Sequence, residues 1–289
     1  TGSGSQTAGA TANLTITAQD ASGNTATTYT GDKSLTFSGA STSASGSAPT
    51  VKGTNGTAVA FGSATTITFT NGVASVASAA NGVMSLYAAE SATISVTDGT
   101  RSSSGSDRLS VTVSAGATSE FAVTMTGGTT ALSAVAKVAG TPFSSRVTAK
   151  DVYGNTAVAF SGTVTLTSTA WTSSNPTATI SANGYVDSIA ITPTVAATGQ
   201  YVVATGGAIS TTQASAAFTV DPGAASKVLV TRQPVGGQSG AVLSTQPRAV
   251  IADAYDNTVT GSSATVTAAL QGGGSGLTGT LGPAAVSGV

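Results

Sequence analysis

The chain has 289 residues, only 7% of them charged, and a formal net charge of −1. Such a weak and balanced charge gives no long-range field, so neither nucleic acid nor an anionic membrane surface is an expected partner. Cysteine and histidine are both absent. Disulfides, thiolate nucleophiles, Cys/His zinc sites and imidazole bases are therefore excluded. No apolar run reaches the roughly 18 residues that a membrane-spanning helix needs.

The composition favours folded β-structure. Hydrophobic residues make up 40% of the chain, and Thr and Val, which fit a pleated surface, are abundant. A disordered chain would be richer in charge and poorer in apolar residues. The length allows two or three domains.

A short segment occurs three times, each time as an alternating strand that runs into an Asp-rich turn. The copies are LTITAQDASGNT at 14–25, RVTAKDVYGNT at 146–156 and AVIADAYDNT at 249–258. A second segment occurs twice, as VSAGATSEFAVT at 113–124 and VDPGAASKVLVT at 220–231. Ala8-Gly9 and Ala139-Gly140 precede the first two Asp-rich turns at the same distance. A period of about 100 residues built of strands predicts tandem all-β modules.

The first predicted module covers residues 1–116. Its strands are expected at 14–19, 34–37, 65–70, 73–77, 83–88, 92–96 and 109–113. Asn71-Gly72 predicts a type I′ hairpin turn and Asn81-Gly82 repeats that signal, while residues 38–56 and 98–107 read as loops. Only nineteen residues precede Asp20, whereas thirty-five separate Gly116 from Asp151. The first module is therefore expected to lack its opening strand.

The second and third predicted modules cover residues 117–223 and 224–289. Strands are expected at 121–125, 145–149, 162–168, 185–191, 200–204, 214–220, 227–230, 246–252 and 264–270. Trp171, the single tryptophan, is expected to be a partly buried edge residue rather than a ligand platform. The third module lacks the closing strands of the second. Incomplete end modules indicate either a piece of a longer chain or strands supplied by neighbouring subunits.

The repeated segments carry a family resemblance. The pattern A-G-T-P-F-x-x-x-V-T-A-x-D-x-Y-G-N-T at 139–156, FSGTVTLTS at 160–168 and V-x-P-G-A-A-S at 220–226 resemble the bacterial immunoglobulin-like repeats of large surface proteins, including invasin-, intimin- and filamin-like modules. The resemblance implies two-sheet antiparallel sandwiches outside a prokaryotic cell, in stalks, adhesins, layer subunits or spacers. It specifies a fold and no activity. The third copy departs from it with Asp256 in place of glycine.

The Asp-rich turns also invite a metal interpretation. Oxygen donors recur at Asp20 and Asn24, Asp151 and Asn155, and Asp253, Asp256 and Asn257. Calcium takes six to eight oxygens, so capping of the turn by Asp and Asn is the favoured interpretation, with Gly supplying positive φ. Calcium remains an alternative, strongest at the third copy with its two nearby carboxylates.

No catalytic site, cofactor site or metal site is expected. The eleven acidic residues are scattered, whereas a glycosidase needs two that face each other, and a Ser triad lacks its histidine. Gly272–Gly274 has no following Lys-Ser/Thr, so it is read as a hairpin tip rather than a phosphate loop. Asn13 and Asn55 lie in glycosylation sequons, and the serine-rich stretches 41–47 and 102–106 could carry O-linked sugars.

Three functions are compatible with these features. The favoured one is a non-enzymatic structural array in an extracellular surface layer, filament or stalk, with neighbouring repeats or other copies as partners. The second is an adhesin that binds a glycan or a surface protein through loops such as 38–56 or 171–176. The third is a spacer attached to a secreted enzyme. An extracellular or cell-surface location is expected for all three.

Overall fold

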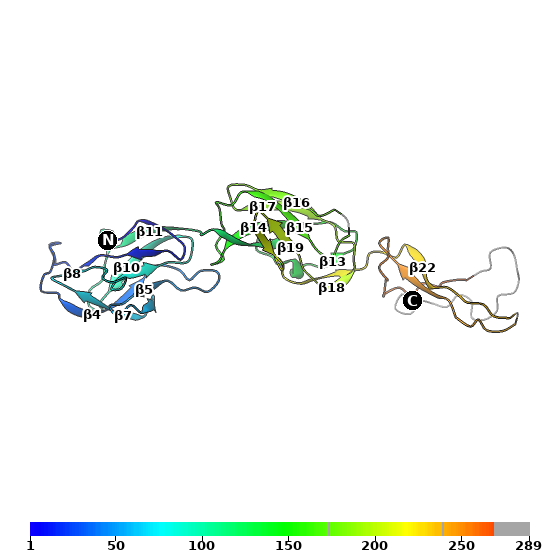
Figure 1. Cartoon of the computed structure of the whole chain (residues 1–289), viewed down its shortest axis with the longest axis horizontal. Helices are drawn as coiled ribbons and strands as arrows, with labels where there is room; N and C mark the ends of the chain where they lie inside the picture. Colours follow the sequence, from blue (N-terminus) through cyan, green and yellow to red (C-terminus); the bar gives the residue numbers. More distant parts are fainter. Residues whose placement is uncertain (173, 239, 269–289) are drawn as a thin grey trace. The chain divides into compact units, whose positions relative to one another are not determined.

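The computed structural model describes residues 1–268 except 173 and 239. Strands dominate, with two short 3₁₀ helices, η1 (Gly105–Asp107) and η2 (Leu132–Ala134), so the predicted all-β class is confirmed (Figure 1). Two compact units divide the chain. The first consists of Thr1–Phe121, Thr148–Gly162 and Ile180–Tyr185, and the second of Ala122–Val147, Thr163–Thr179 and Val186–Val289. No helix among the described residues is long and apolar enough to cross a membrane.

One layer of the first unit is a five-stranded sheet in the order β1-β11-β10-β4-β7. Its strands are β1 (Ser5–Thr7), β4 (Gly31–Ser38), β7 (Ala64–Phe69), β10 (Ser91–Thr97) and β11 (Leu109–Ser114). β1 pairs with β11 in parallel and the other pairs are antiparallel. Apolar residues alternate along β4, which places Leu35 and Phe37 on the buried face.

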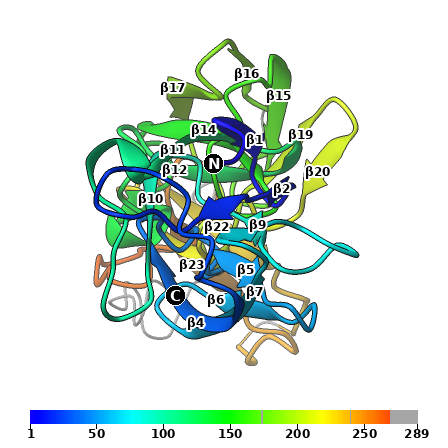
Figure 2. The same ribbon diagram turned by 90° about the vertical axis from the view of Figure 1, so that its left-hand side faces the viewer.

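The other layer consists of a four-stranded sheet, β2-β9-β5-β6, and the pair β3-β8. These strands are β2 (Thr11–Asn13), β3 (Ile16–Thr17), β5 (Thr50–Lys52), β6 (Ala58–Ala60), β8 (Val73–Ala74) and β9 (Val83–Ser85). Figure 2 shows the four-stranded sheet in that order. Val51 and Met84 from this layer join Phe37 and Ile67 from the other in one buried cluster. The first unit is therefore a β-sandwich with a single core.

The following strands make four more sheets, ordered β12-β14-β17, β13-β21-β18, β16-β15-β19-β20 and β22-β23. Their bounds are β12 (Thr118–Met125), β13 (Lys137–Val138), β14 (Phe143–Asp151), β15 (Gly162–Thr167), β16 (Thr177–Ile180), β17 (Tyr185–Ile191), β18 (Ala197–Gln200), β19 (Val203–Gly206), β20 (Ile209–Thr211), β21 (Phe218–Asp221), β22 (Lys227–Arg232) and β23 (Arg248–Ala252). As β1 does with β11, β13 pairs with β21 in parallel. β22 and β23 are antiparallel.

Asn-Gly turns at residues 71–72 and 183–184 occupy equivalent positions in the first and second repeats. Asn71 and Gly72 both have positive φ, 49° and 81°, as a type I′ turn requires. The N–H of Ala18 donates to the carbonyl of Gly72, and the N–H of Ala149 donates to that of Gly184, each at 2.8 Å. The first and second repeats therefore place their Asp-rich strands against corresponding hairpins.

Some predicted strands differ from the observed ones. The stretch 14–19 holds only the two residues of β3, and the loop 38–56 contains β5. The predicted strand 200–204 is divided between β18 and β19, because Val202 bonds instead to Ala214 and to the hydroxyl of Ser215. Residues 264–268 belong to no named strand. Residues 269–270 and the predicted hairpin tip Gly272–Gly274 lie outside the described residues. The predicted module boundaries, 1–116, 117–223 and 224–289, stay a prediction.

Candidate functional site: a repeated docking turn

The three Asp-rich turns share an internal hydrogen-bond pattern. In the second copy, Oδ1 of Asp151 accepts the N–H groups of Tyr153 and Asn155, both at 2.9 Å. In the third copy, Oδ1 of Asp253 accepts those of Tyr255 and Asn257 at 2.8 and 3.0 Å. The first copy repeats the pattern, because Oδ1 of Asp20 accepts from the amides two and four residues on. The capping interpretation of these turns is confirmed.

The other carboxylate oxygen ties the turn to a distant glycine. The N–H of Gly116 donates to Oδ2 of Asp151, and the N–H of Gly223 donates to Oδ2 of Asp253, each at 2.8 Å. The asparagine side-chain amides donate to the same oxygens. Asp151 is 1% exposed and Asp253 is 0% exposed, so these bonds satisfy two buried charges. Such donor-rich surroundings are how a carboxylate is kept ionised inside a protein.

The hydrogen bonds also decide the acidity of the two buried carboxyls. Burial raises the pKa of Asp151, but the bonds from Asn155, Gly116 and Tyr153 together hold it below its ordinary value. The pKa of Asp253 is lowered in the same way. Asp256, the second carboxylate of the calcium alternative, instead pairs with the ammonium group of Lys227 at 2.6 Å. Among the described residues, no group of three or more acidic side chains converges.

The asparagine amide of the second and third copies also reaches a segment from the preceding repeat. Nδ2 of Asn155 donates to the carbonyl of Tyr87 at 2.8 Å, and Oδ1 accepts the N–H of Ala89 at 2.8 Å. These contacts lie within the first unit. Within the second unit, Asn257 bonds to the carbonyl of Thr194 and the N–H of Ala196, at 2.9 and 2.8 Å. One side chain thus acts as donor and acceptor to a peptide segment, much as a neighbouring strand would.

We call the Asp-rich turns at residues 151–155 and 253–257 the docking turns. The tyrosine of each docking turn lies against a glycine of the preceding repeat. Gly9 has φ +78°, and a Cβ built on it would overlap the hydroxyl of Tyr153. Gly140 has φ +83°, and its Cβ would lie 2.6 Å from Cε2 of Tyr255. Glycine is required at both positions for its backbone conformation and for the close approach of the ring. We call the Asp, Tyr and Asn of such a turn, with the contacted glycine and peptide segment, the docking site.

The docking site of Asp151, Tyr153 and Asn155 has two further contacts. The rings of Tyr87 and Tyr153 lie 5.0 Å apart between centroids, a separation typical of favourable aromatic pairs. The N–H of Ser45 donates to the carbonyl of Tyr153 at 3.1 Å. Part of the loop 38–56, which the sequence offered as a ligand-binding loop, is therefore engaged by the docking turn.

The turn at Asp20 has only the internal half of the pattern. Serine occupies the position of the tyrosine, and Asn24 and Asp20 are both exposed. The bonds recorded for the Asn24 side chain, within the described part of the chain, go to the two carboxylate oxygens of Asp20. The hydrogen bond from that side chain is the main cause that lowers the pKa of Asp20. This copy is a folded turn without a docked partner among the described residues.

The remaining candidate residues serve packing or stay open. Trp171 is 5% exposed, so it is more deeply buried than the partly buried edge position that was predicted, and its Nε1 donates to Oδ1 of Asn175 at 3.4 Å. Asn13 lies exposed in β2, and Asn55 lies exposed in a loop, where its Oδ1 accepts the N–H of Thr57. Glycosylation of either asparagine, or of the serine-rich stretches, stays a prediction.

Comparison with known proteins gives similarities only at the level of solved structures. No family model matches the chain, and no curated protein matches it. The Escherichia coli adhesin FdeC is 21% identical over 93% of this chain and 77% of its own, with a TM-score of 0.35. InvD of Yersinia pseudotuberculosis is 15% identical over 96% and 76%, with a TM-score of 0.28. Domains 4–9 of the surface layer protein SbsC are 16% identical over 82% and 39%, with a TM-score of 0.26.

Proposed function

We propose that this chain is a structural repeat array of an extracellular surface protein, in which each docking turn fixes one β-sandwich repeat to the repeat before it. The observation that carries the proposal is the recurrence of one contact set. At two positions about 100 residues apart, the Asp carboxylate accepts a glycine N–H, the Asn side chain bonds to a carbonyl and an N–H, and the Tyr ring lies against a second glycine. A chance loop contact would have no reason to recur with the same residues and partners.

The stabilisation by the docking site can be estimated from the hydrogen bonds of its asparagine side chain. A typical hydrogen bond contributes about 1 kcal/mol net, so the two bonds from Asn155 to Tyr87 and Ala89 contribute about 2 kcal/mol. The contact of Tyr153 with Gly9 and Tyr87 adds apolar burial to this. Because the bonds are made to backbone groups of this same chain, the docking site holds the turn against the preceding repeat without any ligand. The array then transmits geometry along the chain, which is what a stalk, filament or layer subunit requires.

The adhesin alternative is weakened by the same contacts. Of its two predicted loops, 38–56 contains a strand and bonds to the docking turn. The spacer alternative differs from the array only in what else the full protein carries, and it needs no different behaviour of these repeats. An extracellular location is part of the proposal, whereas a glycan or surface-protein ligand belongs to the adhesin alternative alone.

Rigid docking can be tested with spin labels, because the chain contains no cysteine of its own. Ser110 and Val158, both exposed and both within the first unit, are replaced by labelled cysteines, and their distance distribution is measured by electron–electron double resonance. We expect a narrow distribution that broadens when Asn155 and Tyr153 are replaced by Ala and Ser. The matched control Asn24→Ala removes the same internal bond from the undocked turn and leaves the width unchanged. A distribution as broad in the parent as in the docking variant would refute the proposal.

A further inference from the structure

The docking site of Asp151, Tyr153 and Asn155 brings together two tyrosines from different repeats. Tyr87 lies just after β9 of the first repeat, and Tyr153 lies in the docking turn that follows β14 of the second. Their ring centroids are 5.0 Å apart and their ring planes are inclined by 58°. Both residues belong to the first unit. The docking contact is therefore also a contact between two phenol side chains.

The docking turn fixes the position of both rings. Nδ2 of Asn155 donates to the carbonyl of Tyr87 itself at 2.8 Å, so the turn is bonded to the residue that carries the partner ring. Tyr153 also lies so close to Gly9 that a Cβ built on this glycine would overlap the tyrosine hydroxyl. Both tyrosines remain partly exposed. The pair is thus held in place by the fold and is still open to solvent.

The geometry of this pair is close to that of a covalent dityrosine. In a dityrosine, the carbon atoms ortho to the two hydroxyls are joined by a single bond, and the rings are twisted out of a common plane. Two rings joined directly have their centroids only slightly closer together than the 5.0 Å found here. A small movement of the two side chains therefore brings their ortho carbons together. Because the groups are held side by side, coupling is a step within one molecule and needs no encounter between molecules.

We propose that Tyr87 and Tyr153 form a site of oxidative cross-linking, at which a haem peroxidase with hydrogen peroxide joins the two side chains as dityrosine. Each phenol loses one electron and its hydroxyl proton, which gives two phenoxyl radicals. The radicals form a carbon–carbon bond between their ortho carbons. Each of these carbons then loses its hydrogen as a proton, and each oxygen takes up a proton to restore the phenol. Hydrogen peroxide accepts the two electrons and two protons and becomes two molecules of water.

The cross-link would make the docking of the two repeats permanent. It closes a loop of chain between Tyr87 and Tyr153, and a covalent loop restricts the separated state more than the docked one. The chain contains no cysteine, so a disulfide cannot serve this purpose. The inference rests on the proposed docking, because rings that are not docked would meet only by chance.

The other docking site provides an internal comparison. There, Asn257 bonds to the carbonyl of Thr194, as Asn155 does to that of Tyr87. Threonine therefore occupies the position of the first tyrosine and supplies no phenol to Tyr255. The same docking contact is expected to remain uncrosslinked at this site.

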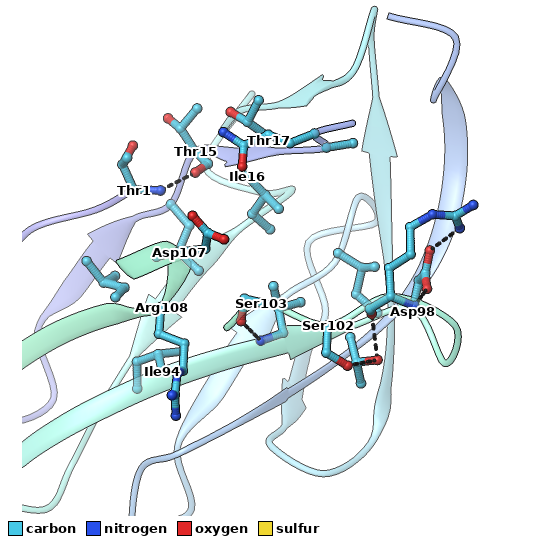
Figure 3. A pocket seen from close by; sticks show the side chains of 18 of the residues that line it. Thr1, Thr15, Ile16, Thr17, Ile94, Asp98, Ser102, Ser103, Asp107 and Arg108 are labelled. Atoms are coloured by element: carbon cyan, nitrogen blue, oxygen red, sulfur yellow. Dashed lines mark hydrogen bonds and ion pairs between the residues drawn. The ribbon is translucent and has the colours of Figure 1, made fainter. Parts of the chain in front are cut away.

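Tyr29 provides a second comparison within the first unit. Its hydroxyl donates to Oδ2 of Asp98 at 2.9 Å, and both residues line a pocket of about 670 Å³ (Figure 3). Its ring packs edge-to-face on Phe69, with 4.9 Å between the centroids. Phenylalanine has no phenol to oxidise, so this aromatic pair should not be cross-linked although it is as close as the tyrosine pair.

Treatment of the whole chain with a haem peroxidase and hydrogen peroxide tests the site. We expect dityrosine fluorescence and, after proteolysis, two linked peptides that contain Tyr87 and Tyr153, with their summed mass reduced by two hydrogens. The yield should stay constant over a hundredfold range of protein concentration, and exchange of the Ala89 amide should slow at least tenfold in the linked protein.

The matched variants keep each ring and remove one phenol. Tyr153→Phe and Tyr87→Phe should each lower the yield of dityrosine at least tenfold. Tyr201→Phe is the control, since it removes a phenol that is 41% exposed and lies outside both docking sites, and it should leave the yield unchanged.

The Ala89 amide, which donates to Asn155, separates this inference from the proposed function. Protection of that amide in the untreated protein, without a linked Tyr87–Tyr153 pair after oxidation, would overturn the cross-linking site and leave the docking intact. An unprotected Ala89 amide in the untreated protein would overturn the proposed docking and the cross-linking site with it. Linked pairs that increase with protein concentration, or that join all tyrosines equally, would show coupling between molecules and would also overturn the inference.

Discussion

Replacement of Gly9 by alanine is the sharpest perturbation of the docking site. Gly9 has φ +78°, and the added Cβ would overlap the hydroxyl of Tyr153. The left-handed conformation alone costs a non-glycine residue about 1 kcal/mol. Displacing or straining the packed ring costs about 1–3 kcal/mol more. The sum predicts a loss of about 2–4 kcal/mol, most of it from the docking contact.

Gly23→Ala is the matched control. Gly23 has φ +82° in the undocked first turn, and nothing lies within 4 Å of its Cβ position. It therefore carries the conformational cost of about 1 kcal/mol and no steric one. Hydrogen exchange at the amides of Ala89 and Gly116, both bonded to the docking turn, measures undocking directly. Exchange there should accelerate in Gly9→Ala and stay unchanged in Gly23→Ala.

A double-mutant cycle with Tyr153→Ser completes the experiment. Serine is what the undocked first turn carries at this position, and it removes the ring that the new methyl group would strike. Gly9→Ala should then cost little more than Gly23→Ala, with a coupling energy of about 1–3 kcal/mol between the two positions. A coupling near zero, or equal effects of the two glycine substitutions on Ala89 exchange, would refute the assigned contact.

Three further predictions follow from the same geometry. Asn257→Ala should lower the stability of its docking site by about 2 kcal/mol more than Asn24→Ala lowers that of the first turn, since Asn257 loses two additional backbone partners. Hydrogen exchange of the Ala196 amide measures the effect, and equal losses of stability in the two variants would contradict it. The pKa of Asp151 is lowered from its ordinary value, so the contribution of its docking site to the free energy of unfolding should be complete above about pH 4 and should be lost as acid protonates the folded carboxyl. Hydrogen exchange of the Gly116 amide, followed from pH 6 to 2.5, tests this. Protection of that amide that increases on acidification would contradict the prediction. Asp256 has φ +70° and an exposed ion pair, so Asp256→Gly should gain about 1 kcal/mol of conformational energy against at most about 1 kcal/mol from the pair; thermal unfolding at high salt, which screens the pair, should show the gain, and a destabilised variant there would refute it.

The sequence was informative wherever structure is set locally. Alternation identified most of the longer strands, and the Asn-Gly and Asp-rich turns were located because their hydrogen bonds join residues two to four positions apart. The short strands β5 and β13 were not predicted, because two or three residues are too few to show an alternating pattern and are held in a strand by their neighbours. Val202 shows the opposite failure, since its bonds to Ala214 and Ser215 interrupt a run that looked continuous.

The docking site needed three-dimensional information. The sequence singled out the Asp turns and the Ala-Gly pairs at residues 8–9 and 139–140, but nothing in the pattern says that they meet. Asn155 and Tyr87 are 68 residues apart. The available signal was the absence of tyrosine from the first turn alone, which separates a turn that docks from one that only folds.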